Sequence, residues 1–492
     1  MKSWYIVMAS LLLVSTAFVS TANASMLMKE VVWEDEVDYA LEAFGGVYRL
    51  DPELTQLVDK LGRLLVTGAA LDKRYQFIVL NDHEPRLWTL PGGYVLLSWG
   101  AIRMAGNEAQ LAALLAHGLH HAVMARDDTK VSMITAYSEE VLPPLGKIPN
   151  YALGGSQVSL SRLRRQTFSR IDELQADHHA QKYMAAAGYH PSALSQLQQK
   201  LLDLSKGEAT SSLWPHRSTQ EQIDRSQEQV MRLEFRQPGS WTDGDSLDTI
   251  GERLATVSPA YQLLKKSEQS FLWRATRLIN KAVAIEPREG KFFARLGDIQ
   301  MQRQQCAESI NYYQQALLLG YTSYRAYLGK GYCENKLGRQ DQALEDLTAA
   351  SRLLPNAIAA EQMAGIQQKL GRTAEAKRAL LQLMPVQGAR RAWAEKRYIE
   401  LDFDSNPEFY FVAGSRVRDG EFITLITNQS GLPVSGIDVR FTATVKGELR
   451  EEMISAGKLE VSGQVELRPG WQIDEGDEVK DVYVRVVNVT QS

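Results

Sequence analysis

A repeat with a period of 34 residues occupies the middle of this 492-residue chain and limits its possible folds more than any other feature. Three series of residues recur at this spacing: Gly297, Gly331 and Gly365; Ala282, Ala316 and Ala350; and Ile279, Tyr313, Leu347 and Leu381. Small residues where two helices cross, with large apolar residues between them, are typical of tetratricopeptide repeats. Because such helix pairs bury their apolar faces against neighbouring pairs, we expect residues 263–400 to form an α-helical array with a groove for protein partners.

The hydrophobic period changes to two after about residue 404. Apolar and polar residues alternate from Ile437 to Val445, and the series Val482, Val484 and Val486 repeats the pattern near the end of the chain. Strict alternation predicts half-buried β-strands. We therefore expect residues 404–492 to form a C-terminal β-sandwich domain.

The first residues have the pattern of an export signal. Lys2 precedes an apolar run, and Ala22-Asn23-Ala24 has the small-x-small pattern of a cleavage site. We expect residues 1–24 to be a signal peptide that is cut after Ala24, which places the mature protein in a bacterial periplasm; an uncleaved membrane anchor is the alternative. No later run is apolar over the roughly 18 residues that a spanning helix needs, so no transmembrane anchor is expected after cleavage.

The net charge argues against a nucleic-acid partner, whereas the cysteine content leaves open whether a disulfide forms. The net charge is −4, so the chain has no basic excess with which to neutralise nucleic-acid phosphates, and no nucleic-acid partner is expected. Only two cysteines are present, Cys306 and Cys333. In an exported chain these residues form either one disulfide or two separate buried thiols, and both alternatives stay open.

Two histidines stand four residues apart on a predicted buried helix. Leucines recur with helical spacing from Leu111 to Leu119, so His117 and His121 project from one face, one turn apart. This is the ligand half of the pattern H-E-x-x-H, in which the glutamate after the first histidine is the general base of a zinc peptidase. Gly118 stands in that place. Since glycine also costs about 1 kcal/mol relative to alanine inside a helix, its presence has no evident stability rationale in the sequence.

A carboxylate from a second helix completes the expected metal site. Zinc in a peptidase takes three protein ligands and keeps its fourth position open. Glu173 and Asp177 lie four residues apart on a later predicted helix. Glu173 is the candidate third ligand of one Zn²⁺ per chain. Asp177 is the candidate hydrogen-bond partner for the second ring nitrogen of a ligand histidine.

These motifs resemble peptidase family M48, in particular its BepA-like periplasmic members with tetratricopeptide repeats. Residues 90–93 match the L-P-G-G of the family, residues 107–121 match N-E-x-x-L-A-x-x-L-x-H-E-x-x-H except at Gly118, and residues 173–177 match E-x-x-x-D. The resemblance implies an α+β zincin-like metallopeptidase domain over residues 25–235, so the whole chain is expected to be multidomain. A change of composition from Arg236 to Ser240 predicts a linker over residues 236–262.

The resemblance also implies two further site features. His216 falls at the histidine of the family motif H-P-x-x-x-x-R and is an additional candidate metal ligand, although Arg217 and Gln222 replace the proline and the arginine. A strand that begins near Tyr94 is implied to pair with an extended substrate peptide at a sheet edge. Its substrate-binding residues would be Gly93, Tyr94, Val95 and Leu96. A covered structural strand is the alternative.

Three functions remain open on the sequence. The favoured one is an M48-type zinc protein of envelope and outer-membrane protein quality control, which binds unfolded or assembling envelope proteins and hydrolyses them poorly or not at all. Glycine cannot move a proton, and general acid–base catalysis contributes about 10²–10⁴-fold. The second is an active endopeptidase with a substitute base, with candidates Glu108, Glu139, Glu140 and His120. The third is a metal-free tetratricopeptide scaffold.

Overall fold

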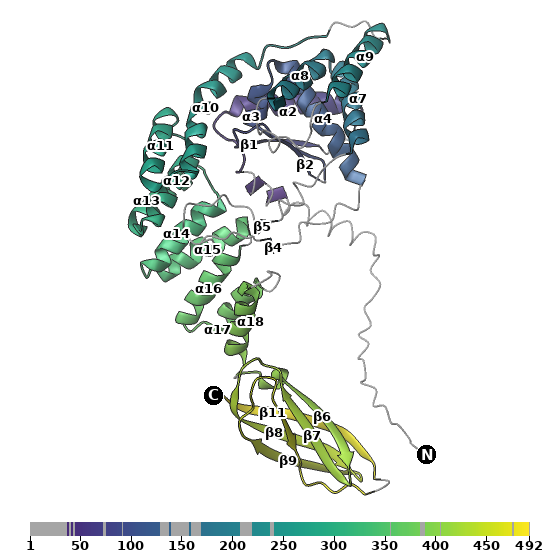
Figure 1. Ribbon diagram of the computed structural model, residues 1–492, viewed down its shortest axis with the longest axis vertical. Coiled ribbons are helices and arrows are strands. Elements are labelled where there is room, and N and C mark those ends of the chain that lie inside the picture. The colour runs from purple at the N-terminus through teal and green to yellow at the C-terminus, as the bar shows by residue number, and fades with distance from the viewer. Residues whose placement is uncertain are drawn as a thin grey trace. The chain divides into compact units, whose positions relative to one another are not determined.

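The computed structural model describes residues 37–38, 41–42, 45–71, 75–90, 92–127, 137–138, 157–158, 169–206, 219–236, 241–354, 356–383, 389–403, 405–474 and 477–491 (Figure 1). The predicted signal peptide with its cleavage site lies outside these residues, as do Glu139, Glu140 and His216. The chain divides into two compact units, with a boundary after Gln262. A short hairpin of β4 (Tyr137–Ser138) and β5 (Gln157–Val158) is grouped with the second unit.

The first unit contains a three-stranded sheet in the order β1-β3-β2. Its strands are β1 (Gln76–Leu80), β2 (Leu87–Leu90) and β3 (Tyr94–Ser98), and β3 pairs in parallel with β1 and antiparallel with β2. Gly92 and Gly93 have φ angles of 86° and 91°, a conformation that favours glycine, and their turn folds β3 back along β2.

The predicted edge strand is therefore wrong. β3 is the central strand of the sheet, and its backbone pairs on both sides, with Gln76 opposite Tyr94 on one side and Leu90 opposite Tyr94 on the other. The backbone oxygen of Gly93 also accepts a hydrogen bond from the amide of Gln76, at 2.9 Å. Val95 and Leu96 are fully buried. These four residues, Gly93, Tyr94, Val95 and Leu96, are consequently structural and do not offer an open edge to a peptide.

Helices lie on one side of this sheet, and α4 (Glu108–Asp127) packs against both β2 and β3 (Figure 1). It also contacts α2 (Pro52–Gly68), α7 (Arg170–Ala186) and α8 (Ser192–Lys206). The remaining helices of the unit are α3 (Trp99–Met104) and α9 (Gln220–Arg236). Because α4 has neighbours on several sides, every residue from Glu108 to Ala122 is buried.

The predicted linker over residues 236–262 is wrong over its second half, where α10 (Asp248–Glu268) is a continuous helix. Pro259 lies inside it, which costs a helix about 3 kcal/mol. Burial offsets that cost: Leu254 and Tyr261 are almost completely buried, and the Tyr261 ring packs edge-on against Trp99 with centroids 4.8 Å apart. The composition change from Arg236 to Ser240 predicted a linker, whereas the buried apolar residues after Asp248 stabilise a helix.

Helix pairs in the second unit confirm the helical repeat. They are α12 (Gly290–Gln302) with α13 (Cys306–Leu318), α14 (Tyr324–Lys336) with α15 (Gln340–Leu353), and α16 (Ala357–Lys369) with α17 (Thr373–Leu381), flanked by α11 (Leu272–Ile285) and α18 (Ala389–Asp402). The recurring alanines at positions 282, 316 and 350 are fully buried. The recurring Tyr313 is also fully buried, and its hydroxyl donates a hydrogen bond to Asp298 Oδ1 at 2.7 Å.

Both cysteines are free thiols and belong to one small cluster. Cys306 begins α13 and packs with Met301, Ile310 and the fully buried Cys333 of α14. Burial, together with a hydrogen bond to the thiol of Cys306, raises the pKa of the Cys333 thiol. The two thiols are therefore neighbours within the repeats that are not joined by a disulfide.

Two three-stranded antiparallel sheets complete the second unit, in the orders β10-β7-β6 and β11-β8-β9. After the short helix η2 (Pro407–Tyr410), the strands are β6 (Phe411–Arg418), β7 (Glu421–Asn428), β8 (Val434–Val445), β9 (Glu448–Ala456), β10 (Gln464–Leu467) and β11 (Val479–Gln491). Ile426, Phe441 and Trp471 lie in one hydrophobic core that both sheets share. The predicted alternation holds along β8. Among the described helices of the chain, none is long and apolar enough to span a bilayer.

The repeat glycines provide a test of this packing. A Cβ atom on Gly297 would lie 2.8 Å from the buried ring of Tyr313, whereas a Cβ on Gly365 meets no atom within 4 Å. We expect Gly297→Ala to lower the free energy of unfolding by about 1–3 kcal/mol through overpacking. Gly365→Ala, the matched control two repeats later in the same series, should leave the free energy of unfolding unchanged or raise it by up to about 1 kcal/mol. Urea denaturation followed by helical circular dichroism measures both, and equal effects would contradict the assigned helix crossing.

Candidate metal centre

His117 and His121 lie in the buried middle of α4. The side chain of Asn107 caps the helix by accepting a hydrogen bond from the Gln110 amide at 2.8 Å, and the Gln110 side chain accepts one from the Gly106 amide at 2.9 Å. This reciprocal cap fixes the residue at which α4 begins. The two histidine side chains face each other with their Nε2 atoms 3.1 Å apart, and the residues are only 7% and 0% exposed.

Glu173 reaches the same point from α7. Ser169 and Asp172 form a capping box at the start of that helix, so Glu173 stands in its first turn. Its carboxylate oxygens lie 3.4 Å from His117 Nε2 and 3.5 Å from His121 Nε2. One ligand atom from each of the three side chains lies within 4.8 Å of the others. The structure thus brings together the three residues that the sequence selected.

This donor set fits a zinc ion. Two imidazole nitrogens and one carboxylate oxygen are the protein ligands of peptidase zinc sites, in which a fourth position stays open. The surrounding charge also favours a cation. Burial alone lowers the pKa of His117, but hydrogen bonds and electrostatic attraction from Asp177 and Glu173 outweigh it and raise that pKa to about 10. Two carboxylates that hold a proton on a buried imidazole can equally stabilise a divalent ion in its place.

A chain of hydrogen bonds orients the first histidine. His117 Nδ1 lies 3.0 Å from Asp177 Oδ1, and the other carboxylate oxygen of Asp177 accepts a hydrogen bond from Gln222 Nε2 at 3.0 Å. The Gln222 side-chain oxygen accepts hydrogen bonds from the amide and hydroxyl of Thr219, at 2.9 and 3.1 Å. The side-chain amide of Gln222 is therefore held through both its oxygen and its nitrogen, and the nitrogen faces Asp177. Such outer partners fix the ring orientation of a ligand histidine.

Sequence reasoning missed this role of Gln222, which it registered only as a departure from the family arginine. A local signal was present. Thr219 and Gln222 form the pattern T-x-x-Q of a capping box at the start of α9. The backbone N–H of Gln222 donates a hydrogen bond to the Thr219 hydroxyl at 3.2 Å. Arg170 of α7 also binds the neighbouring Glu221, with Nε donating to Oε2 at 2.8 Å. These contacts fasten the start of α9 beside the candidate site.

Gly118 has a packing role that the sequence did not reveal. A Cβ atom at this position would lie 2.9 Å from Val95 Cγ1 on β3 and 3.0 Å from Leu87 Cδ1 on β2. A Cβ at these distances would force Val95 or Leu87 to shift, so glycine allows α4 to pack against the sheet without disturbing them. The expectation that Gly118 has no stability rationale is wrong. The space in which the side chain of a general base would begin contains Val95 and Leu87.

The described candidates for a substitute base point elsewhere. Glu108 lies nine residues before His117, roughly 13 Å along the helix axis, and accepts hydrogen bonds from the Tyr189 hydroxyl and the Ser246 amide. His120 contacts residues other than the candidate metal ligands, since it stacks on His179 with ring centroids 4.3 Å apart and its Nδ1 lies 3.3 Å from the Tyr183 hydroxyl. Burial, with repulsion from the neighbouring histidines, lowers the pKa of His120 to about 4.

Comparison with known proteins agrees with the family resemblance. The description "Peptidase family M48" matches residues 50–230. The beta-barrel assembly-enhancing proteases of Escherichia coli (strain K12) and Yersinia pestis are 26% and 28% identical to this chain over 181 and 172 residues. These matches cover 34% and 32% of this chain and 37% and 34% of those proteins. The matched part therefore spans just over one third of the length of either relative.

Two further comparisons are with a mitochondrial protein and with a solved structure. The mitochondrial metalloendopeptidase OMA1 of Schizosaccharomyces pombe is 27% identical over 154 residues, which cover 30% of this chain and 43% of that protein. The crystal structure of PilW, a type IV pilus biogenesis factor, aligns with 42% of this chain and 86% of its own at 17% identity. Its TM-score is 0.24, which supports no conclusion about this fold. The resemblance to family M48 inferred from the motifs is confirmed.

The close approach at Gly118 can be measured by substitution. We expect Gly118→Ala to lower the melting temperature, because overpacking costs about 1–3 kcal/mol and the helix preference of alanine returns only about 1 kcal/mol. Val95→Ala removes the methyl group nearest to the new Cβ. The double variant should therefore lose less than the sum of the two single losses in differential scanning calorimetry. Strictly additive losses would show that position 118 and Val95 do not touch.

The orienting chain makes a second prediction, on zinc affinity. Removing the partner of a ligand histidine typically weakens metal binding by about 10–100-fold, so Asp177→Ala should show a loss of that size in competition titrations with a zinc chelator. Gln222→Leu should weaken binding in the same direction but less, because it acts through Asp177. Asp224→Ala, on the exposed face of the same helix α9, is the matched control. Unchanged affinity in Asp177→Ala would remove this residue from the site.

Proposed function

Since residues 50–230 belong to peptidase family M48, we propose that this chain is an M48-type zinc protein that binds envelope proteins and hydrolyses them weakly or not at all. The proposal includes a zincin-like α+β domain over residues 25–235, a repeat array over residues 263–400 and a β-sandwich over residues 404–492. His117, His121 and Glu173 are the proposed ligands of one Zn²⁺, and His216 is an additional candidate that lies outside the described residues.

One observation carries the proposal: an assembled ligand set stands beside a position that has no base. Zinc in such a site lowers the pKa of a bound water and polarises a peptide carbonyl. Proton transfer from that water to the leaving amine needs a side chain at the position of Gly118. Val95 and Leu87 lie where that side chain would begin, and Glu108 and His120 face other partners. Metal binding is thus supported, whereas efficient hydrolysis is not.

The proposed clients and compartment follow from the relatives and the N-terminal pattern. The relatives from Escherichia coli and Yersinia pestis are named beta-barrel assembly-enhancing proteases. We propose that the present chain likewise acts in envelope and outer-membrane protein quality control, in the periplasm, after cleavage behind Ala24. Its helical repeats, which stack as quasi-linear arrays with extended surfaces, are the proposed means of holding protein partners. Unfolded or assembling envelope proteins are the proposed clients.

A proteolysis assay tests the catalytic part of the proposal. Purified mature protein loaded with zinc should cleave unfolded fluorescein-labelled casein at least about 10²-fold more slowly than a zinc endopeptidase with an intact glutamate, because general acid–base catalysis contributes 10²–10⁴-fold. 1,10-Phenanthroline, a zinc chelator, should change the residual rate little. Brisk cleavage that the chelator abolishes would contradict the proposal and establish an active enzyme with a substitute base.

Measurements of zinc content and client binding distinguish the proposed zinc protein from the remaining alternative, a metal-free scaffold. Elemental analysis should find one zinc per chain in the wild type and a strong loss in His117→Ala. Wild-type protein without zinc after incubation with one equivalent of the metal would instead establish a metal-free scaffold. Binding of reduced and alkylated lysozyme, an unfolded basic protein, measures client capture in the same preparations. Failure of the wild type to bind it would reject the proposed role in client binding.

A further inference from the structure

A cationic surface with an exposed tryptophan lies on α11. The helix sequence from Leu272 to Ile285 contains Arg274, Arg277 and Lys281 and no acidic residue, in a chain whose net charge is −4. Seven residues line an open hollow of about 520 Å³ on this helix: Trp273, Thr276, Arg277, Asn280, Lys281, Ala284 and Arg303. We call these seven residues the α11 surface.

The tryptophan on this surface is exposed without being required by the fold. Trp273 is 68% exposed, and the neighbouring Phe271 is 77% exposed. The core of the helix is made by other residues, since Ala275, Ile279 and Ala282 are fully buried. Protein interfaces are enriched in tryptophan and arginine relative to the rest of the surface. These two residue types also carry a large share of the binding energy.

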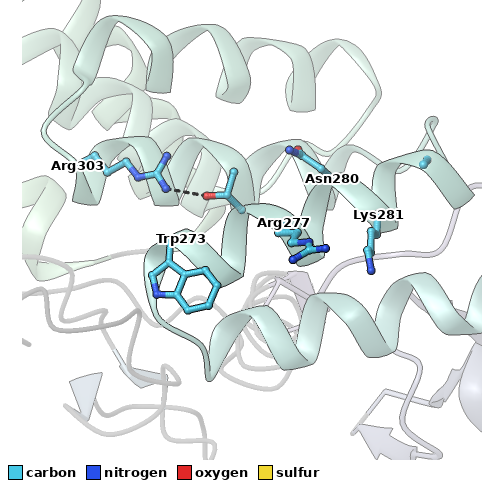
Figure 2. Close-up of a pocket in the computed structure, with 7 residues that line it drawn as sticks. Trp273, Arg277, Asn280, Lys281 and Arg303 are labelled. Carbon is cyan, nitrogen blue, oxygen red and sulfur yellow. Dashed lines mark hydrogen bonds between the residues drawn. The ribbon is translucent and has the colours of Figure 1, made fainter.

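The cations of the α11 surface are aligned and available. Figure 2 shows Trp273, Arg277 and Lys281 in a row along α11, with Arg303 reaching over from the end of α12. Arg303 is held in place because its Nη2 donates a hydrogen bond to Thr276 Oγ1 at 3.0 Å, the dashed line in Figure 2. The same Nη2 donates a second hydrogen bond to the Leu272 carbonyl at 3.4 Å. Within the described part of the chain, neither Arg277 nor Lys281 forms an ion pair.

We propose that the α11 surface binds an acidic peptide segment of a partner protein, with carboxylates on Arg277, Lys281 and Arg303 and an apolar side chain on Trp273. The residues extend from Trp273 to Ala284, roughly 16 Å along the helix. A row of that length matches several carboxylates along a peptide better than one compact anion. The proposal rests on the proposed role of the repeats in holding proteins, and it adds the surface and the partner's chemistry.

Other occupants fit the same surface less well. A second copy of this chain would place cations against cations in a two-fold interface, which costs free energy. A lipid surface requires a helix that buries its apolar face some 5–10 Å into the membrane. The apolar face of α11 is already buried in the protein, with Ala275, Ile279 and Ala282 fully covered. An acidic protein segment therefore remains the favoured ligand.

Fluorescence anisotropy of full-length mature protein tests the proposal with a fluorescein-labelled peptide of alternating glutamate and leucine. The wild type should bind this peptide and should bind the matched glutamine–leucine peptide at least about tenfold more weakly. Arg277→Glu with Lys281→Glu should weaken binding by about tenfold or more, and Trp273→Ala should weaken it in the same direction. Lys369→Glu, an exposed charge reversal on α16, is the control and should change affinity less than about twofold.

Several outcomes would overturn the proposal. Equal binding of both peptides, or unchanged binding in the α11 variants, would show that the surface does not recognise carboxylates. Sedimentation with phosphatidylglycerol vesicles that depends on Arg277 and Lys281, without peptide binding, would identify a lipid surface as the ligand. Binding of reduced and alkylated lysozyme is measured in parallel. If the wild type binds lysozyme but not the acidic peptide, this inference fails while the client-binding role stands.

Discussion

The packing of α7 against α4 is the interaction on which the candidate centre depends. A ligand set drawn from two helices requires backbones that are held to within about 0.5 Å of the productive geometry. Caps at Asn107 and Ser169 fix where the two helices begin. Ala176 and Ala180 are fully buried on the same stretch of α7 as Glu173, and small side chains let helices approach closely. The short reach from Glu173 to both imidazoles follows from this close contact.

Packing and catalysis make opposite demands on position 118. A general base needs room for its side chain between α4 and the sheet, whereas Val95 and Leu87 need that room for a dense core. Glycine satisfies the core and removes the base. The outer support of the site is nevertheless intact, since Asp177, Gln222 and Thr219 still orient His117. A candidate ligand set without the proton carrier is the combination on which the proposed binding function rests.

The spacing of residues in the sequence was sufficient to predict geometry that lies within one helix or one repeat. The interval of four residues placed His117 and His121 on one helix face, and the period of 34 located the helix pairs. Pairing between strands was not predictable in the same way: a motif marked the strand at Tyr94, but only the neighbours β1 and β2 show that it is central. The packing at Gly118 and the contact between Gln222 and Asp177 likewise join segments far apart in the chain. For α10, the composition change near Pro238 predicted a linker, and only the burial of Tyr261 shows that the helix packs into the first unit.

Anomalous diffraction at the zinc absorption edge, from crystals of the zinc-loaded mature protein, tests the central claim most directly. We predict a single strong peak between His117, His121 and Glu173, with metal–nitrogen distances of about 2.0–2.1 Å to both imidazoles. A peak at any other cluster, or an ion bound to the histidines with Glu173 turned away, would contradict the assignment of the metal centre.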